Sequence, residues 1–309
     1  MSNLNRYLQK FKELKESVRI IECNGQNVSI EKVDEECQIY LNCQIVATLI
    51  NNGCFQSTEF IGILNDISHL CLEIKYPSES FDNTMSEVVN LRKSGQLTNN
   101  FLISVFITGI RVTDYKLENH TDINIAILDN TVEILEGISC CATFCGCSSL
   151  TQVTIPSSVR GFGGSVLRGC SSLTEITIPS SIDDLGCRSF EGCTSLKNIT
   201  IPSSIKTISS EAFKGCTSLT HISIPSISRI DKGTFDGCSN LKEITIPSSV
   251  KQIDKNAFKG CSSITQITIP SLVTKICEST FEDCTSLKEI IIPPTVDEIK
   301  NVLLKDVHH

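Results

Sequence analysis

A short phrase that recurs seven times constrains this chain more than any other feature of its sequence. It is GCTSLTHISIP over residues 215–225, and close copies stand at 192–202 and 237–247. Each copy carries a cysteine at the same place, and successive cysteines are separated by 23, 23, 23, 22, 23 and 23 residues. A constant period in the twenties is typical of a solenoid, in which each repeat forms one coil. The seven cysteines are Cys147, Cys170, Cys193, Cys216, Cys238, Cys261 and Cys284.

The unit at residues 241–263 is the best formed, and it predicts how one coil is built. Apolar and polar residues alternate in EITIP, as they do in a strand, and the proline ends the strand because it has no amide hydrogen. The next residues, SSVKQI, predict a turn and a second short extended piece, and DKNAFKGC predicts a short helical or 3-10 return. The predicted inward positions of this coil are Leu241, Ile244, Ile246, Val250, Ile253 and Phe258.

One coil alone cannot fold, because its few apolar side chains do not offset the entropy lost when the whole unit becomes ordered. Stacked coils add backbone ladders and cover each other's faces, so each coil is stabilised by its neighbours. The sequence therefore predicts an α/β solenoid of 23-residue units over residues 119–309. About seven coils are regular, and degenerate coils stand at both ends, the first of them at INIAILDNTVEIL, residues 123–135.

Residues 1–118 do not follow the repeat, and they predict a separate N-terminal region. This region is expected to be either a small α/β unit or irregular coils that continue the stack. Apolar residues at helical spacing predict an amphipathic helix over 3–18. A second helix is predicted over 78–95, and strands are predicted at VRIIEC, CQIYLNCQIVATLI, HLCLEIKYP and NNFLISVFITGIRV.

The periodic cysteines are predicted to be structural. If each occupies one inward position per coil, the thiols form a row at the strand spacing of about 4.8 Å, where a small apolar side chain packs well. Disulfides between neighbours are disfavoured because parallel Cα–Cβ vectors do not fit the required dihedral angle, and a metal needs ligands that converge on one point. The cluster SCCATFCGC at 139–147 lacks zinc-site spacing and a nearby histidine, so we prefer an irregular first coil to a metal site there.

The repeat consensus LxxIxIPxxVxxIxxxAFxxC resembles the BspA-like, or Treponema pallidum-type, leucine-rich repeat. The resemblance covers about residues 123–304, and the proline, phenylalanine and cysteine all recur in register. It implies a right-handed leucine-rich-repeat solenoid with strands on one face, used for protein binding. Bacterial members of that family are described as adhesins for host matrix proteins such as fibronectin and fibrinogen. The cysteine-rich repeats with Ser-Ser pairs are most similar to the protist members, such as those of Entamoeba.

The charge and hydropathy of the chain indicate which classes of partner it can bind and where in the cell it is expected. A net charge of −8 without a basic stripe disfavours a nucleic-acid partner. No run approaches the roughly 18 apolar residues of a membrane span. Charged residues interrupt MSNLNRYLQKFKELKESVRII, so it is not predicted to be a signal peptide. We therefore predict a cytoplasmic protein with reduced thiols, and membrane or surface association is the alternative.

The sequence contains no motif that predicts an enzyme. It lacks GxxxxGK[ST], HExxH and GxSxG, and no motif places a nucleophile or a carboxylate beside any of its five histidines. We therefore predict no catalytic residue, no cofactor and no metal site. An enzyme whose site lies in residues 1–118 remains the alternative from a different class.

The remaining candidate for function is the surface that the repeated strands present. In each LxxIxI segment the residues between the inward positions point outward and form rows along the stack. Strand propensity alone would explain the threonines, but a regular polar sheet is also the platform on which solenoids bind. We predict a non-enzymatic scaffold that binds a protein partner in the cytosol, with an adhesin for fibronectin or fibrinogen as the alternative. The predicted partner-binding residues are Gln152, Thr154, Glu175, Thr177, Asn198, Thr200, His221, Ser223, Glu243, Thr245, Gln266, Thr268 and Glu289.

Overall fold

The computed structural model describes residues 18–23, 26–33, 38–42, 69–75, 86, 88–98, 102–108, 121–128, 134–135, 143–296 and 298–299. The chain divides into two compact units, Met1–Gly109 with Asp122–Asp129 and Ile110–Thr121 with Asn130–His309. Nearly all of the helix predicted over 3–18 lies outside the described residues, and its last residue, Val18, instead begins a strand. The predicted boundary between residues 118 and 119 stays a prediction.

The first unit contains a sheet. In spatial order, β1, β2 and β3 are antiparallel, and β3, β4, β5 and β6 are parallel. Four of these strands lie in segments predicted to be strands, and β6 lies in the segment 123–135 that was predicted to be a degenerate first coil. The strand β2 was missed because most of its residues are polar. The predicted segment 78–95 contains helical residues 88–93. The strands are β1 (Val18–Cys23), β2 (Gln26–Val33), β3 (Gln38–Asn42), β4 (His69–Lys75), β5 (Leu102–Thr108) and β6 (Ile125–Leu128).

The parallel part of this sheet is held by both apolar and polar contacts. Leu70, Ile103 and Val105 are buried on β4 and β5. Asn124, just before β6, bonds twice to Ile103: its amide donates to the Ile103 carbonyl at 2.9 Å, and its side-chain oxygen accepts from the Ile103 amide at 2.9 Å. The asparagine thereby fixes where the pairing of β5 with β6 begins.

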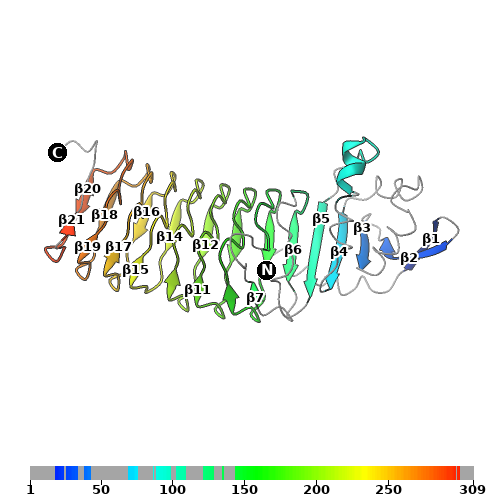
Figure 1. Ribbon diagram of the computed structural model, residues 1–309, viewed down its shortest axis with the longest axis horizontal. Coiled ribbons are helices and arrows are strands. Elements are labelled where there is room, and N and C mark those ends of the chain that lie inside the picture. The colour runs from blue at the N-terminus through cyan, green and yellow to red at the C-terminus, as the bar shows by residue number, and fades with distance from the viewer. Residues whose placement is uncertain are drawn as a thin grey trace. The chain divides into compact units, whose positions relative to one another are not determined.

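The second unit is a parallel β-solenoid with a repeat of about 23 residues, as the sequence predicts (Figure 1). Each regular coil contributes one strand of three residues and one of two residues. The three-residue strands, which we call the front row, are β8 (Gln152–Thr154), β10 (Glu175–Thr177), β12 (Asn198–Thr200), β14 (His221–Ser223), β16 (Glu243–Thr245), β18 (Gln266–Thr268) and β20 (Glu289–Ile291).

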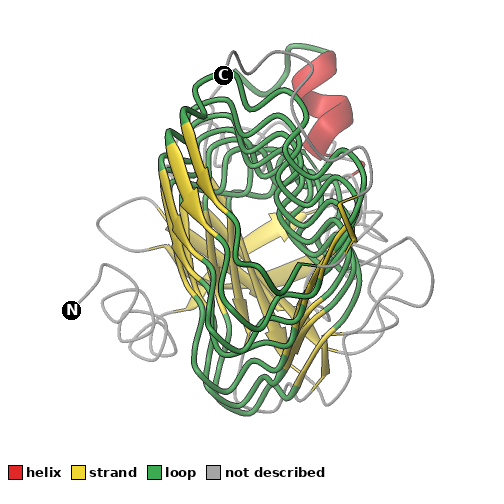
Figure 2. Ribbon diagram, turned by 90° about the vertical axis from the view of Figure 1, so that its left-hand side faces the viewer, coloured by secondary structure: helices red, strands yellow, loops and turns green. Residues whose placement is uncertain are grey.

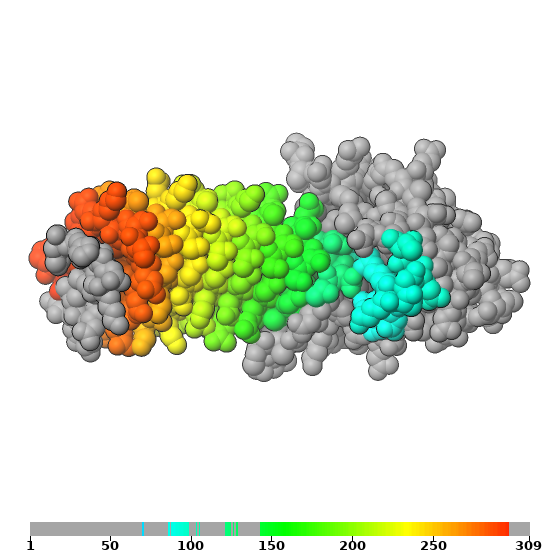
Figure 3. Space-filling model, turned by 90° about the horizontal axis from the view of Figure 1, so that it is seen from above, coloured from blue at the N-terminus to red at the C-terminus, as the bar shows by residue number. Residues whose placement is uncertain are grey.

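The two-residue strands form a back row. They are β7 (Ile134–Leu135), β9 (Gly161–Phe162), β11 (Asp184–Leu185), β13 (Thr207–Ile208), β15 (Arg229–Ile230), β17 (Gln252–Ile253), β19 (Lys275–Ile276) and β21 (Glu298–Ile299). Seen along the stack, the two rows lie on different sides of a flattened coil (Figure 2). In the space-filling view the coils form adjoining bands (Figure 3).

The return from the back row to the next coil consists of tight turns. In a typical coil the amides of Lys259 and Cys261 donate to the carbonyls three residues earlier, at 3.1 Å each. This is the 3-10 hydrogen-bond pattern, as expected, although the bonds are too scattered to form a continuous helix. The one coil that is a residue shorter than the others replaces the turn after its proline with a tighter one, in which the amide of Ile227 donates to Pro225 at 2.7 Å.

A column of phenylalanine rings runs through the core. Neighbouring rings are stacked with centroids 5.3–5.7 Å apart and planes within 18° of each other. The coil that ends at Cys170 has Leu167 in place of the phenylalanine, and Phe162, on β9, supplies the ring that stacks on the next coil. The exchange keeps the column filled. The stacked rings are those of Phe162, Phe190, Phe213, Phe235, Phe258 and Phe281.

The seven periodic cysteines, which we call the cysteine ladder, are all buried. Their thiols also make hydrogen bonds that the sequence did not suggest. The Cys216 thiol donates to the Phe190 carbonyl at 3.2 Å, and the same oxygen accepts the amide of Cys193 at 3.1 Å. Each thiol thus ties its coil to the preceding one. Equivalent bonds are made by Cys170, Cys193, Cys238, Cys261 and Cys284.

Alkaline pH should destabilise the solenoid through these thiols. Burial raises the pKa of the Cys238 thiol to about 12, whereas in the unfolded chain it ionises near a pKa of about 8.5. The unfolded state therefore releases the proton first, and the free energy of unfolding falls as pH rises between these two values. One thiol contributes up to roughly 1.4 kcal/mol per pH unit. We expect Cys238→Ala to flatten this dependence by that amount in urea titrations at several pH values. Parallel pH profiles would contradict this prediction.

Candidate functional site: the front row

The structure places the predicted partner-binding residues on the outer side of the front row. In β10, β12, β14 and β18 the two outer residues are exposed and the central isoleucine is buried. Glu243, Thr245 and Glu289 are exposed as well. Gln152 and Thr154, on β8, are only half-buried, so the first coil presents less of its side chains to solvent.

The strand register aligns these side chains in two rows. Across β10 and β12, Glu175 lies opposite Asn198 and Thr177 lies opposite Thr200. Across β14 and β16, His221 lies opposite Glu243 and Ser223 lies opposite Thr245. Across β18 and β20, Gln266 lies opposite Glu289, and Thr268 lies opposite Ile291. The hydroxyl row therefore ends in an apolar side chain, which is 46% exposed.

Pairing along the front row is interrupted, although the coils are nearly identical in sequence. The described strands pair as β10 with β12, β14 with β16 and β18 with β20, and no ladder joins β8 to β10, β12 to β14 or β16 to β18. On the back row, β15, β17, β19 and β21 form one continuous ladder. From β10 to β20 the front surface is therefore divided into two-stranded pairs.

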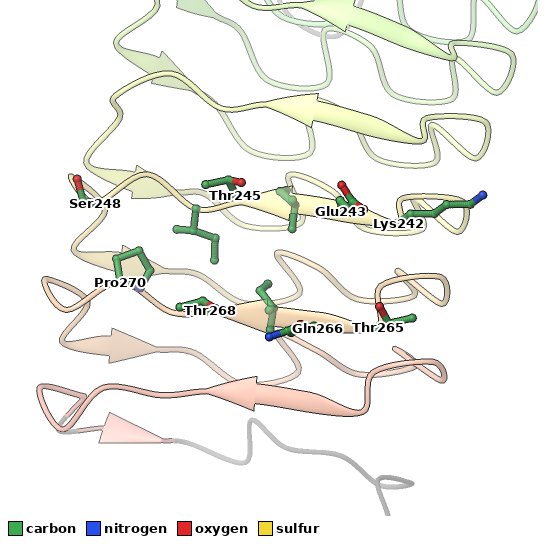
Figure 4. Close-up of a pocket in the computed structure, with 11 residues that line it drawn as sticks. Lys242, Glu243, Thr245, Ser248, Thr265, Gln266, Thr268 and Pro270 are labelled. Carbon is green, nitrogen blue, oxygen red and sulfur yellow. The ribbon is translucent and has the colours of Figure 1, made fainter.

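A shallow depression lies at two of these three interruptions. The one between β16 and β18 has a volume of about 580 Å³, and its lining includes Lys242, Gln266 and Pro270 (Figure 4). The other, of about 400 Å³, is lined by residues of β12, β14 and β16. Glu243 and Thr245 line both, so they stand between the two hollows.

Many charged side chains away from the front row form ion pairs, although the exposed Arg160 and Lys251 form none with the described residues. Away from this row, ion pairs tie successive coils: Arg188 to Glu211 at 2.6 Å and Lys259 to Glu282 at 2.9 Å are examples. Over the described coils, every ion pair lies off the front row. The front-row charges are therefore available to a partner. They are Glu175, Glu243 and Glu289 on the strands, together with Lys197, Lys242 and Lys288, each of which directly precedes a front-row strand.

The chemistry of this surface is suited to recognition. Its side chains are hydroxyls, amides, lysines, carboxylates and the imidazole of His221, whose Nδ1 lies 3.0 Å from the Thr220 hydroxyl. In the described part of the chain, no three His, Cys, Asp or Glu side chains are grouped as a metal site would require. Cys140 and Cys141 of the cluster at 139–147 lie outside the described residues. No helix among the described residues is long and apolar enough to cross a bilayer.

The repeat pattern predicted the outward residues but not two other features of the surface. It did not predict the interrupted pairing, because nothing in the repeat distinguishes a paired junction from an open one. The second feature is a lysine directly before every other front-row strand, which the sequence shows. At this position Lys197, Lys242 and Lys288 alternate with Thr220 and Thr265.

Comparison with known proteins identifies the repeat. The BspA type leucine rich repeat region matches residues 111–228 and 208–308, in six copies. The T. pallidum leucine-rich repeat protein is 23% identical with a TM-score of 0.46, covering 54% of this chain and 80% of that one. A leucine-rich cell surface protein of Faecalibacterium prausnitzii is 23% identical with a TM-score of 0.37, covering 74% and 73%. The pneumococcal vaccine antigen PcpA is 15% identical with a TM-score of 0.39, covering 75% and 69%. No curated protein matches the chain.

Proposed function

Since the chain belongs to the BspA type leucine-rich repeat family, we propose that it is a non-enzymatic scaffold that binds a protein partner on the front row. One observation carries the proposal. Ion pairs between coils neutralise charges on other parts of the solenoid, whereas the charges of the front row have no such partner among the described residues. We assign this binding to residues 119–309 and treat 1–118 as a separate N-terminal region.

We further propose that this scaffold works in the cytosol. The support is the cysteine content: seventeen cysteines in one chain, with the ladder thiols donating hydrogen bonds that a disulfide would abolish. A reducing compartment preserves such thiols. The Ser-Ser pairs and cysteines of the repeat support an origin in a protist such as Entamoeba. The alternative is an adhesin at the cell surface that binds host matrix proteins.

The test is a pair of arginines on the front row. We expect Thr200→Arg with Thr245→Arg to weaken partner binding at least tenfold, because the long cationic side chains fill both depressions that these residues line. The matched control adds the same charge elsewhere, with Thr207→Arg and Ser228→Arg at exposed positions off the front row. Binding would be measured on partners captured separately from cytosolic and surface fractions, and on purified fibronectin and fibrinogen.

The outcomes separate the alternatives. A cytosolic partner that is lost in the front-row variant and kept in the control supports the scaffold. Front-row-dependent binding to fibronectin or fibrinogen, with the protein found at the surface, supports the adhesin. Equal affinities for both variants would place the site away from the front row and contradict the proposal.

A further inference from the structure

The part of the front row that runs from β16 to β20 combines several features that the other coils do not share. It contains the larger of the two depressions, between β16 and β18. Its last strand carries Ile291, the one large apolar side chain that is exposed on the described front-row strands. It also carries two Lys-Glu dipeptides, Lys242-Glu243 and Lys288-Glu289, which lie two coils apart.

The spacing of these charges defines a distance along the stack. Lys242 and Lys288 lie on coils separated by one intervening coil, and the same is true of Glu243 and Glu289. On the back row the same three coils pair continuously through β17, β19 and β21. Paired strands are about 4.8 Å apart, so like charges recur about every 10 Å. The intervening coil holds Thr265 and Gln266 at these positions, which are neutral and line the depression.

This repeat matches one form of extended polypeptide. A polyproline II helix rises about 3.1 Å per residue with three residues per turn, so every third side chain returns to the same face after about 9.3 Å. A segment of this kind that crosses the strands along the stack can present a basic side chain to Glu243 and, three residues later, another to Glu289. Acidic neighbours in the same segment can reach Lys242 and Lys288, whereas a purely basic segment would be repelled by these lysines.

We propose that the front row from β16 to β20 binds an extended partner segment with basic and acidic residues that each recur every third position. The segment lies along the solenoid axis over the depression, and its apolar residues cover Ile291. This inference rests on the proposed function and adds the chemistry of the partner. The affinity for a short segment is modest, because exposed ion pairs contribute little each and are screened by salt.

The probe is a synthetic peptide of four Pro-Lys-Glu repeats, and its control has the same composition arranged as blocks of proline, lysine and glutamate. We expect the full-length protein to bind the repeating peptide at least tenfold more tightly than the block peptide at low ionic strength, measured by fluorescence anisotropy. Glu243→Gln with Glu289→Gln should weaken binding of the repeating peptide about tenfold. Asp183→Asn with Glu278→Gln, which neutralises two carboxylates off the front row, should leave it unchanged.

The results distinguish this inference from the proposal on which it rests. Equal binding of the two peptides, no binding of either, or an affinity that does not depend on Glu243 and Glu289 overturns the inference. If the natural partner is still lost with Thr200→Arg and Thr245→Arg in any of these cases, the front row binds a folded surface and the proposed function stands. If that variant keeps its partner as well, both fail.

Discussion

Replacing Phe213 by alanine should lower the free energy of unfolding by about 3–5 kcal/mol. The ring is fully buried and stacked between those of Phe190 and Phe235, at centroid distances of 5.3 and 5.7 Å. Its removal leaves a cavity in the middle of the column, and the neighbouring rings cannot collapse into it because hydrogen bonds between coils fix their backbones. Urea titration followed by circular dichroism measures the loss.

The chain supplies a control for this variant. Leu167 occupies the equivalent place in an earlier coil, so a leucine is compatible with the local backbone. We expect Phe213→Leu to cost much less than Phe213→Ala, because it keeps most of the buried volume. A loss below about 1 kcal/mol for the alanine variant would show that the column contributes little to the stability of the solenoid. The backbone ladders would then be the main interaction that holds the coils together.

Replacing Gly186 by alanine should cost about 3 kcal/mol, the upper end of what overpacking usually costs. A methyl group built on Gly186 would lie 2.4 Å from the carbonyl carbon of Gly163 and 2.5 Å from the amide nitrogen of Gly164. These are backbone atoms of the preceding coil, so they cannot rotate away as a side chain would. The two coils must separate locally, which strains the bond of 3.0 Å from the Gly186 amide to the Phe162 carbonyl.

The matched control is Ser209→Ala, one repeat further along. Ser209 occupies the place of Gly186 in the next coil, where a side chain is accommodated and is half-buried. We expect Ser209→Ala to change the free energy of unfolding by less than about 0.5–1 kcal/mol. Similar losses for the two variants would show that the close approach at Gly186 is not what makes the glycine necessary.

Most of the fold of the second unit could be predicted because each structural role repeats in the sequence. The alternation of EITIP predicted the front strands, and the regular spacing of the cysteines predicted a buried row, which the cysteine ladder forms. Departures from the repeat were harder to predict from the sequence. Nothing local to Phe162 indicates that its ring replaces the one missing at Leu167, since this depends on where the two side chains meet in the core. In the first unit, β2 was missed because its polar composition hides a strand that pairs on both sides.

The candidate site could be predicted only as a set of outward positions. Strand periodicity identified residues such as Glu243 and Thr245, because it fixes which side chains leave the core. The interruption of pairing between β16 and β18 could not be predicted, because the coils have nearly the same sequence. The acceptors of the cysteine ladder were also hidden, because the carbonyl that Cys216 meets belongs to a residue 26 positions earlier.

One coil has Leu167 at the usual phenylalanine position and takes its ring from Phe162 instead. This departure from the repeat affects how the coils reach their native stacking order. Coils that resemble one another this closely could stack with a neighbour omitted, and such a slipped arrangement would bury almost the same side chains. A ring on the back row in place of one in the return turn, or a coil one residue short at Ile227, fits only its own neighbours. Such irregularities widen the energy gap between the native stack and its slipped competitors. The irregular coils thus specify which coil stacks on which, and a chain of seven identical repeats would lack this information.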